Sequence, residues 1–281
     1  MVYGSYLIIC WQVENDIVSD EVQAIDASLG HENEDKDALV GETIMKMTRL
    51  REEEEKARKA AEEEAKKQAA GKKKADATPV RPSLYWQYIG TDIDTVNFAN
   101  LRATNPQTKA WLIVRGTNIN YPVVQASDNS FYLKHSYTGA LNSSGWVFMD
   151  YEDDPKFKSR NTVIYAHGRN EGTMFGTLKN ALNADWQKNT DNHIVVTATE
   201  HQMLFWKTFS VYRIANTNDY ITVNFKSDNT FMAFVNLVKN RSTHNFNTNV
   251  TASDRVLTLS TCIGTGDRMV LQAVLTEIVN K

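Results

Sequence analysis

A charged run at residues 49–74 limits which part of this chain can fold into a compact domain. It reads RLREEEEKARKAAEEEAKKQAAGKKK, and no apolar side chain larger than alanine lies between Arg51 and Lys74. Strong helix formers dominate it, and several glutamates precede a lysine or arginine by four positions, which supports a helix. A helix without an apolar face has nothing to bury. We interpret the run as a solvated helical spacer or a charged, partly frayed linker.

The compact domain is expected to begin after this run. Lys72–Ser83 reads KKKADATPVRPS, and its two prolines end any helix that reaches them. Three parts are therefore expected: an apolar segment at 1–13, a polar and charged helical stalk and linker at 14–83, and a globular domain at 84–281.

The apolar segment Val2–Trp11 reads VYGSYLIICW and leaves two interpretations open. It is far shorter than the roughly 20 residues that span a bilayer. No basic region precedes it and no small-residue cleavage site follows, so it is a poor signal peptide. It is either the remnant of a membrane-spanning helix or an apolar helix that packs on another surface.

From Leu84 onward, short β-rich runs alternate with turn residues. The expected strands are Trp111–Val114, Pro122–Gln125, Trp146–Met149, Thr162–His167, Ile194–Ala198, Met203–Ile214, Tyr220–Phe225, Val256–Cys262 and Met269–Ile278. The expected helices are Asn97–Ala103, Met174–Leu182 and Asn229–Lys239. Many short strands with few helices predict a mainly β domain, a closed or nearly closed barrel, preceded by a helical N-terminal extension.

Charge and cysteine content exclude several classes of function. The formal net charge of the 281 residues is −3, which gives no general basis for contacts with nucleic acid. The two cysteines, Cys10 and Cys262, form neither a CxxC pair nor a Cys/His cluster, so no zinc site is expected. A disulfide framework is not expected either, and we expect no cofactor.

Cys262 is a candidate nucleophile because of the strand in which it lies. In VLTLSTC, residues 256–262, alternation places Leu257 and Leu259 on the core face and Cys262 on the other face. After the loop IGTGD, Arg268 begins the returning strand. Antiparallel pairing would bring Cys262 and Arg268 close together. A cation favours the reactive thiolate, and a guanidinium offers donors to a developing oxyanion. A small buried cysteine and a structural ion pair with Asp267 are the alternatives.

A cysteine nucleophile needs a proton-transfer partner, and His167 is the strongest candidate among six histidines. It ends the expected strand in NTVIYAHG and is followed by Gly168, where a loop begins. Functional side chains are often held where a strand leads into a loop. Any single histidine is nevertheless more often structural.

These residues carry a resemblance to the sortases. TLSTC, followed six residues later by Arg268, resembles the sortase active-site signature. NTVIYAHGRNEGTMFGTLKN resembles the segment around the sortase histidine in its class B form, and the segments at 110–125 and 128–136 resemble class B sequence. A helix at Asn229–Lys239 lies where class B enzymes carry an extra helix. The resemblance covers about Leu84 to Lys281.

The resemblance implies an eight-stranded sortase-type β-barrel and a cysteine transpeptidase. Cys262 would attack the threonine carbonyl of a C-terminal sorting signal and form a thioacyl-enzyme, with Arg268 as oxyanion stabiliser and His167 as general acid/base. Implied partners are surface proteins or pilins that carry the signal, and an amine acceptor from a cell-wall precursor or a pilin lysine. A single-pass N-terminal anchor would hold the enzyme on the outer face of a Gram-positive-type cell membrane.

The resemblance also suggests substrate-binding residues. Tyr220 and Ile221 are expected to line the groove, and Ser260 to face it, with ordinary β packing as the alternative for the first two. Residues 105–108 spell NPQT, which resembles a signal that some class B enzymes cleave. No apolar span or basic tail follows it, so Asn105 as a helix cap before Pro106 explains it better.

Two other classes of function use the same residues differently. A cysteine protease or amidase would pass the acyl group to water, and a non-catalytic scaffold module on a stalk would not use these residues for chemistry. A reaction that depends on an amine acceptor indicates a transpeptidase and not a protease or amidase. Cleavage of any peptide excludes the non-catalytic scaffold module.

Overall fold

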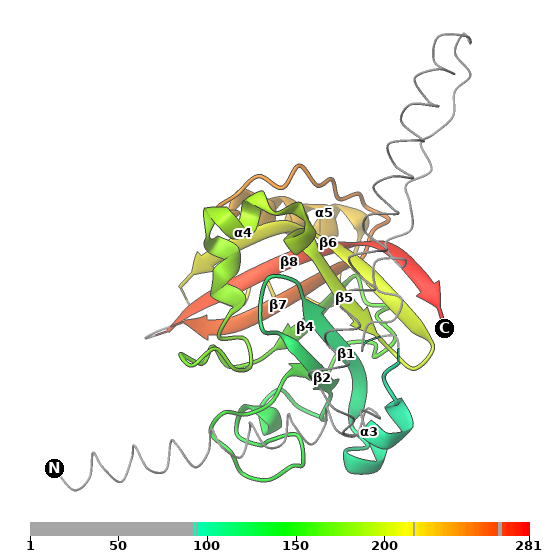
Figure 1. The fold of residues 1–281 in the computed structure, drawn as a ribbon. Coiled ribbons are helices and arrows are strands. Elements are labelled where there is room, and N and C mark those ends of the chain that lie inside the picture. The colour runs from blue at the N-terminus through cyan, green and yellow to red at the C-terminus, as the bar shows by residue number, and fades with distance from the viewer. Residues whose placement is uncertain (1–92, 94, 216, 264–265) are drawn as a thin grey trace, which may run out of the picture. The chain divides into compact units, whose positions relative to one another are not determined.

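The computed structural model describes residue 93 and residues 95–215, 217–263 and 266–281; at 262 and 263 the description covers the backbone. These residues form a closed barrel with the strand order β1-β2-β3-β4-β7-β8-β6-β5 (Figure 1). The expected apolar segment at 1–13 and the stalk and linker at 14–83 lie outside the described residues.

Eight strands and a few helices make up the described part of the chain. The strands are β1 (Thr108–Val114), β2 (Asn120–Val124), β3 (Phe148–Met149), β4 (Asn161–Tyr165), β5 (Ile194–Ala198), β6 (Gln202–Ile214), β7 (Val256–Ile263) and β8 (Asp267–Asn280). The α-helices are α3 (Phe98–Thr104), α4 (Ala184–Lys188) and α5 (Asp228–Asn240), and the 3-10 helices are η2 (Phe131–Leu133), η3 (Leu178–Leu182) and η4 (Thr190–His193). None of the helices described here is long and apolar enough to cross a membrane.

The predicted mainly β, eight-stranded barrel is confirmed, but two predicted elements are wrong. Residues 220–225 form no strand. The helix expected over Met174–Leu182 is reduced to the 3-10 turn η3, which begins at Leu178. Met174 has a φ of +50° and bridges Gly168, and a residue in this left-handed region does not begin a right-handed helix.

Two of the strand pairings in the barrel are parallel. β2 pairs with β3 and β4 pairs with β7 in parallel, whereas the other neighbouring strands are antiparallel. The β4–β7 register runs from Asn161 opposite Val256 to Tyr165 opposite Ser260. Because the two strands point the same way, the residues that follow them emerge at the same end of the barrel.

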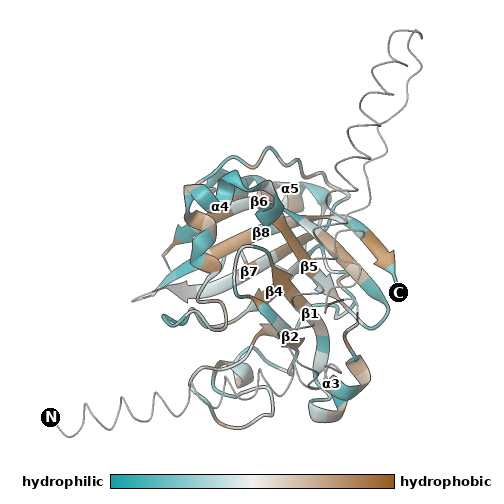
Figure 2. Cartoon of the chain, in the orientation of Figure 1, coloured by the Kyte–Doolittle hydropathy of each residue, from teal (hydrophilic) through white to brown (hydrophobic). Residues whose placement is uncertain are grey.

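The two faces of the barrel wall belong to two separate apolar clusters. Leu257 and Leu259 of β7 lie in the large cluster with Trp111 and Trp206, whereas Val256 lies in a second cluster with residues of α5. The alternation predicted for β7 is therefore confirmed for the residues before Cys262. Figure 2 shows apolar residues concentrated along the strands, while the short helix α4 is largely hydrophilic.

Helix α5 covers the outer face of β6, β7 and β8 with one apolar stripe. Phe231, Phe234, Val235 and Val238 are buried, the spacing of a single helical face. The helix begins at a capping box, in which Ser227 accepts from the backbone of Thr230 and the Thr230 side chain accepts from the backbone of Ser227.

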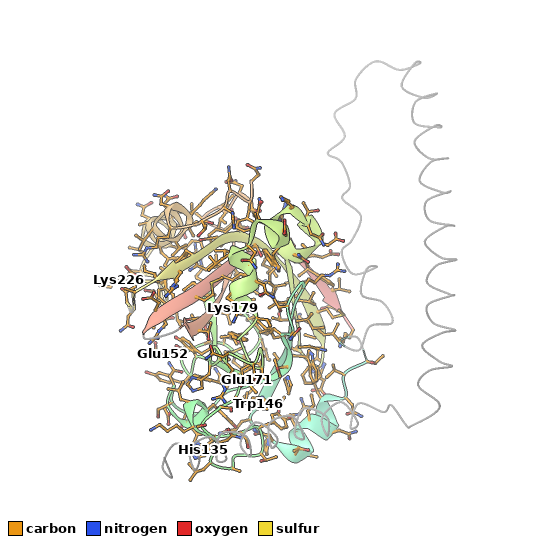
Figure 3. The ribbon with its side chains drawn as sticks, turned by 60° about the vertical axis from the view of Figure 1, so that its left-hand side comes forward. His135, Trp146, Glu152, Glu171, Lys179 and Lys226 are labelled. Atoms are coloured by element: carbon orange, nitrogen blue, oxygen red, sulfur yellow. The ribbon has the colours of Figure 1, made fainter. Side chains whose placement is uncertain are left out.

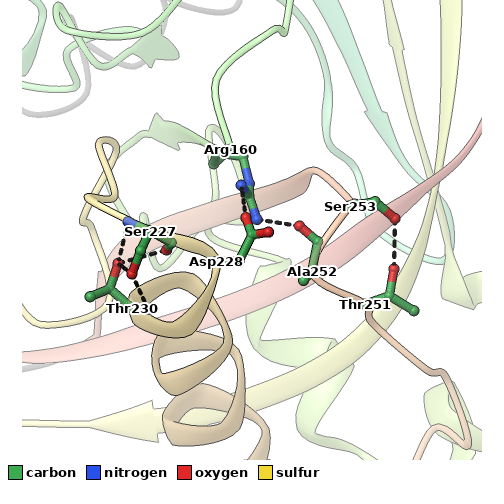
Figure 4. A network of polar contacts seen from close by, with 7 residues as sticks. All are labelled: Arg160, Ser227, Asp228, Thr230, Thr251, Ala252 and Ser253. Atoms are coloured by element: carbon green, nitrogen blue, oxygen red, sulfur yellow. Dashed lines mark hydrogen bonds and ion pairs between the residues drawn. The ribbon is translucent and has the colours of Figure 1, made fainter.

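Arg160, just before β4, ties the start of α5 to the barrel (Figure 4). Its Nη1 donates to Asp228 Oδ1 at 2.9 Å, and its Nη2 donates to the carbonyl of Ala252. The guanidinium carbon lies 4.1 Å from the centroid of the Phe231 ring. One side chain therefore joins a strand, a helix and the loop that leads into β7.

The NPQT segment is part of the framework, and the predicted cap is wrong in one respect. Asn105 ends helix α3 rather than beginning a helix. Its Nδ2 donates to Tyr132 Oη at 2.8 Å and to the carbonyl of Tyr137 at 2.6 Å, and its Oδ1 accepts from the backbone of Gln107. Asn105 and Thr108 are both buried, and β1 begins at Thr108.

Candidate active site

A pocket of about 230 Å³ opens where β4 and β7 end and β8 begins. Five of the predicted site residues lie in its lining: His167, Tyr220, Ile221, Ser260 and Arg268. The remaining lining residues are Asn129, Leu133, Phe148, Tyr165, Ala166, Asn218 and Thr261. Side chains from distant parts of the chain therefore converge on one hollow.

The backbone register places Cys262 directly opposite Arg268. The β7–β8 ladder runs from Val256 opposite Val274 to Ile263 opposite Asp267 without a shift. Thr261, the neighbour of Cys262, lines the pocket, as does Arg268. The predicted closeness of the two positions thus follows from an uninterrupted antiparallel ladder.

Asp267 lies beside Arg268 and has a partner of its own. Its Oδ2 accepts from Arg213 Nε at 2.7 Å, across the β6–β8 pairing. The Asp267 carboxylate is therefore engaged with a residue of β6. Because successive residues of a strand point to opposite faces, Asp267 and Arg268 belong to opposite faces of β8.

The sequence predicted a strand over Thr162–His167, but β4 ends at Tyr165 and His167 lies two residues beyond it. The carbonyl of His167 accepts from the backbone of Phe175, which fixes the backbone after the strand. Its Nε2 lies 2.8 Å from the carbonyl oxygen of Leu133. A carbonyl only accepts, so Nε2 carries the hydrogen and Nδ1 is the acceptor of the neutral ring.

The loop that supplies the Leu133 carbonyl is held from several sides. Asp128 Oδ1 accepts from the backbone of Ser130 and of Phe131, where η2 begins. His135 stacks on Phe131 with ring centroids 3.9 Å apart, and it lies near the lower edge of the molecule in Figure 3, below Trp146. The backbone of Trp146 donates to the carbonyl of Tyr132 at 2.9 Å. The acceptor for His167 is therefore built into a folded loop.

Gly145 occupies the narrow space between this loop and the histidine ring. Its φ is +60°, a conformation that favours glycine. A Cβ there would meet the Tyr132 carbonyl and would lie 3.0 Å from both His167 Cδ2 and the Leu133 carbonyl oxygen. The close approach of loop and imidazole thus depends on the missing side chain.

Tyr220 and Ser260 form the buried side of the pocket. Tyr220 Oη and Ser260 Oγ are 3.0 Å apart, and both side chains are almost fully buried. Ile221 is partly buried against the cluster under α5. The three residues predicted as substrate contacts are therefore adjacent and line the pocket, although Tyr220 and Ile221 do not lie on a strand.

Tyr165 and Asn129 are pocket residues that the sequence analysis did not single out. Both donate to the same oxygen, Asp150 Oδ2, at 2.8 Å. Burial, followed by the nearby Asp150 carboxylate, raises the pKa of Tyr165 above its ordinary value, so its phenol stays protonated at neutral pH. Tyr165 lies two residues before His167 in a segment with strand-like alternation, and this spacing is the signal that could have indicated it.

The other histidines in the described part of the chain make contacts elsewhere. His193 Nε2 lies 2.8 Å from the carbonyl of Gln187, and His244 Nε2 lies 2.9 Å from that of Leu182. His201 is largely exposed. Of the histidines that the structure describes, His167 alone lines this pocket. The described residues also contain no group of three or more His, Cys, Asp or Glu that could hold a metal ion.

A family model of the sortase domain matches residues 112–276, which include the pocket and the β7–β8 ladder. The chain belongs to the sortase family. Sortase B of Listeria monocytogenes is 31% identical over 180 residues, which is 63% of this chain and 72% of that protein.

Two solved sortase structures have the same fold. The crystal structure of sortase B from Bacillus anthracis in complex with AAEK1 has a TM-score of 0.59 at 35% identity, covering 64% of this chain and 84% of that one. A Staphylococcus aureus sortase B–substrate complex has a TM-score of 0.61 at 28% identity, covering 69% and 90%. This sortase is therefore class B-like, and it is a cysteine transpeptidase.

Gly145→Ala is expected to lower activity more than stability. The added methyl would meet the Tyr132 carbonyl, which forces the loop to shift, and would crowd the His167 ring and the Leu133 carbonyl that holds it. A misplacement of about 1 Å at a reacting group can cost on the order of 100-fold in rate. We expect kcat for peptide cleavage to fall by about that factor in a protein that still melts cooperatively.

Gly139→Ala is the matched control for this substitution. Gly139 also has a positive φ, +83°, but a Cβ there would meet nothing within 4 Å. Both variants carry the backbone strain, of roughly 1–2 kcal/mol, and only Gly145→Ala adds the contacts with the Tyr132 and Leu133 carbonyls and with His167. Equal activity losses in the two variants would contradict a role for Gly145 in placing the histidine.

Proposed function

We propose that Cys262 is the nucleophile, His167 the general acid and base, and Arg268 the oxyanion stabiliser of this transpeptidase. One observation carries the proposal: His167 and Arg268 line the same pocket, and the β7–β8 register sets Arg268 opposite Cys262. Membership of the sortase family agrees with a cysteine as the attacking group. Tyr220, Ile221 and Ser260 are proposed to bind the substrate.

The proposed reaction has two steps, each with its proton accounted for. The Cys262 thiolate attacks the carbonyl carbon of a threonine in the sorting signal, and Arg268 donates to the oxyanion. As the peptide C–N bond breaks, His167 gives its proton to the leaving amine, and a thioacyl-enzyme forms. An acceptor amine then attacks the thioester, His167 takes up the proton, and the thiolate leaves.

The contact with Leu133 suggests which nitrogen of His167 carries this proton. Nε2 is engaged with the carbonyl of Leu133 at 2.8 Å. In the imidazolium both nitrogens are donors. We propose that Nδ1 gives and takes the proton while Nε2 keeps the ring in place.

The proposed substrates are surface proteins or pilins with a C-terminal sorting signal. The acceptor is an amine, from a cell-wall precursor or from a pilin lysine. That the Staphylococcus aureus relative has been solved as a substrate complex supports substrate recognition by this fold. A water acceptor would make the chain a protease, and the acceptor experiment below separates the two.

The first prediction concerns the nucleophile. Wild-type protein is incubated with a pool of sorting-signal peptides, including one with Asn-Pro-Gln-Thr, with and without an amine acceptor, and products are identified by mass spectrometry. We expect a thioacyl adduct on Cys262 and an amine-dependent product. Cys262→Ala should abolish both, because the thioester cannot form.

Cys10→Ala is the control for this experiment and should retain nearly full activity, since Cys10 is the other thiol of the chain. Cleavage by the Cys262→Ala variant would refute the assignment. Cleavage at an unchanged rate, without any amine adduct, would favour the protease.

The second prediction concerns Arg268. Its proposed partner is an oxyanion that exists only in the transition state, so Arg268→Ala should lower kcat far more than it raises KM. Loss of one such donor typically costs about 10²–10³ in kcat. Arg268→Lys keeps the charge without the planar fork and should recover part of the loss.

Melting curves and steady-state kinetics on the same preparations separate this role from a structural one. A structural Arg268 would lower the melting temperature and leave kcat per folded molecule unchanged. A normal kcat in folded Arg268→Ala would remove Arg268 from the mechanism.

The third prediction concerns the N-terminal part. We propose that residues 1–13 contribute to a membrane anchor and that 14–83 are a stalk on the outer side of a Gram-positive-type membrane. The charged run has no apolar face to contribute to the core. Removal of residues 1–80 should therefore leave a soluble, active protein with a cooperative melt. An insoluble or non-cooperative product would show that the boundary is wrong.

A further inference from the structure

The segment between β6 and α5 forms a wall with open space on both sides. Asn218, Tyr220 and Ile221 line the active-site pocket. Asp219 and Thr222 instead line a second hollow of about 450 Å³, bordered by α5. Tyr220 and Ile221 pack against the apolar cluster under α5. Apolar packing is weakly directional, so polar contacts that fix particular atoms bear on the exact position of this wall between the two hollows.

Polar contacts with residues outside the segment bear on its position. Tyr220 Oη is 3.0 Å from Ser260 Oγ, and the Thr222 carbonyl accepts from Asn161 Nδ2 at 2.9 Å. Asp219 accepts from both terminal nitrogens of Arg241, at 2.7 and 2.6 Å. The contact with Arg241 is the charged and bidentate one, the geometry that gives the strongest directional preference.

Arg241 is itself well placed to serve as an anchor. It caps the C-terminus of α5, where its backbone donates to the carbonyl of Val238. Its guanidinium carbon lies 6.0 Å from the centroid of the Tyr212 ring, and that ring meets Tyr220 edge-on at 6.4 Å. The hydrogen bonds from Arg241 lower the pKa of Asp219, so the pair stays charged at neutral pH.

We propose that the Asp219–Arg241 ion pair positions the wall formed by Asn218, Tyr220 and Ile221, and thereby determines how tightly the pocket holds its peptide. The inference deepens the proposed function, since it takes this pocket as the peptide site. Asp219 and Arg241 act through the wall and are positioning residues, not catalytic ones.

The solvent exposure of the Asp219–Arg241 pair indicates that it contributes more to the position of the wall than to the free energy of unfolding. The Arg241 and Asp219 side chains are 22% and 43% exposed. Ion pairs as accessible as this one contribute little to global stability, because water screens them and side-chain entropy opposes them. Loss of the pair should therefore move the wall without unfolding the barrel.

The helix offers a matched control at its other end. Arg160 and Asp228 form an ion pair at the start of α5. Like the Arg241–Asp219 pair, it joins an arginine to an aspartate and lies at one end of this helix. In the part of the chain that the structure describes, the partners of the Arg160 side chain are Asp228, Ala252 and Phe231, and these do not line the pocket. Arg160→Gln removes the contacts with Ala252 and with the Phe231 ring at 4.1 Å, whereas Arg241→Gln removes a longer contact with the Tyr212 ring at 6.0 Å. Arg160→Gln should therefore lower the melting temperature at least as much as Arg241→Gln, yet leave KM unchanged.

The experiment compares wild-type protein, Arg241→Gln, Asp219→Asn, the double variant and Arg160→Gln, all in the full chain. Hydrogen exchange of the amides at 217–223 reports the wall directly, without any substrate. Steady-state kinetics use the pool peptide that the wild type cleaves fastest. Alkylation of Cys262, followed by mass spectrometry, checks that the reactive thiol is unaffected.

We expect faster exchange at 217–223 in both single variants and an approximately tenfold rise in KM with kcat nearly unchanged, because the lost interaction acts on binding. The double variant should be no worse than either single one, the signature of two residues that act as a pair. Arg160→Gln should change exchange only near the start of α5.

Several results would overturn the inference. Unchanged exchange at 217–223 would show that the pair does not hold the wall. Additive effects in the double variant, or a loss confined to the melting temperature, would show that the two residues do not act together on the pocket. If the wild type cleaves no peptide, the proposed function fails, and the exchange data still decide whether the ion pair holds the wall.

Discussion

The register between β7 and β8 is the constraint on which the rest of the site depends. A shift of one residue between two strands exchanges the faces of the sheet. Here the shift would also move Leu257 and Leu259 out of the large apolar cluster, so the core specifies the register. Burial of two leucines at one end of β7 therefore fixes which residue of β8 lies across from Cys262 at the other end.

The position of His167 near the β7–β8 ladder depends on a parallel strand pairing and on a loop. β4 runs beside β7 in parallel, so the chain after Tyr165 leaves at the same end as the chain after Ser260. The ring of His167 is then oriented by the Leu133 carbonyl, 34 residues away in the sequence. The sheet thus sets the place of the imidazole, and the loop sets its orientation and its tautomer.

Sequence patterns predicted those parts of the fold whose own residues determine the structure. Residues 194–198 and 256–262 have short apolar or alternating patterns, and α5 has a clear apolar face between a capping box and a polar end, so these elements were confirmed almost to the residue. Tyr220–Phe225 has the same β-like composition but forms no strand. Asn161 donates to the carbonyl of Thr222, Ser260 contacts the hydroxyl of Tyr220, and Arg241 pairs with the neighbouring Asp219. Sequence periodicity carries no record of such contacts.

The candidate site divides in the same way. Cys262, Arg268 and His167 could be selected from local pattern, because strand ends and a short β-hairpin place them. Asp150 accepts hydrogen bonds from both Tyr165 and Asn129. It could not be selected from the sequence, because these two partners come from separate segments that only the closed barrel brings together. Residues that support a site through a second residue are therefore the ones that sequence reasoning misses here.

The two ends of α5 show how such supports divide their work. The helix is long enough to bury an apolar stripe against β6, β7 and β8, and that burial is a large part of what holds it on the barrel. Each end of the helix carries an ion pair with a distant part of the chain. Arg160, just before β4, pairs with Asp228 at the start of α5, 68 residues later. Arg241, at the end of α5, pairs with Asp219 in the wall of the pocket, 22 residues earlier. A helix that covers the outside of the barrel thereby also influences the width of a hollow that it does not line.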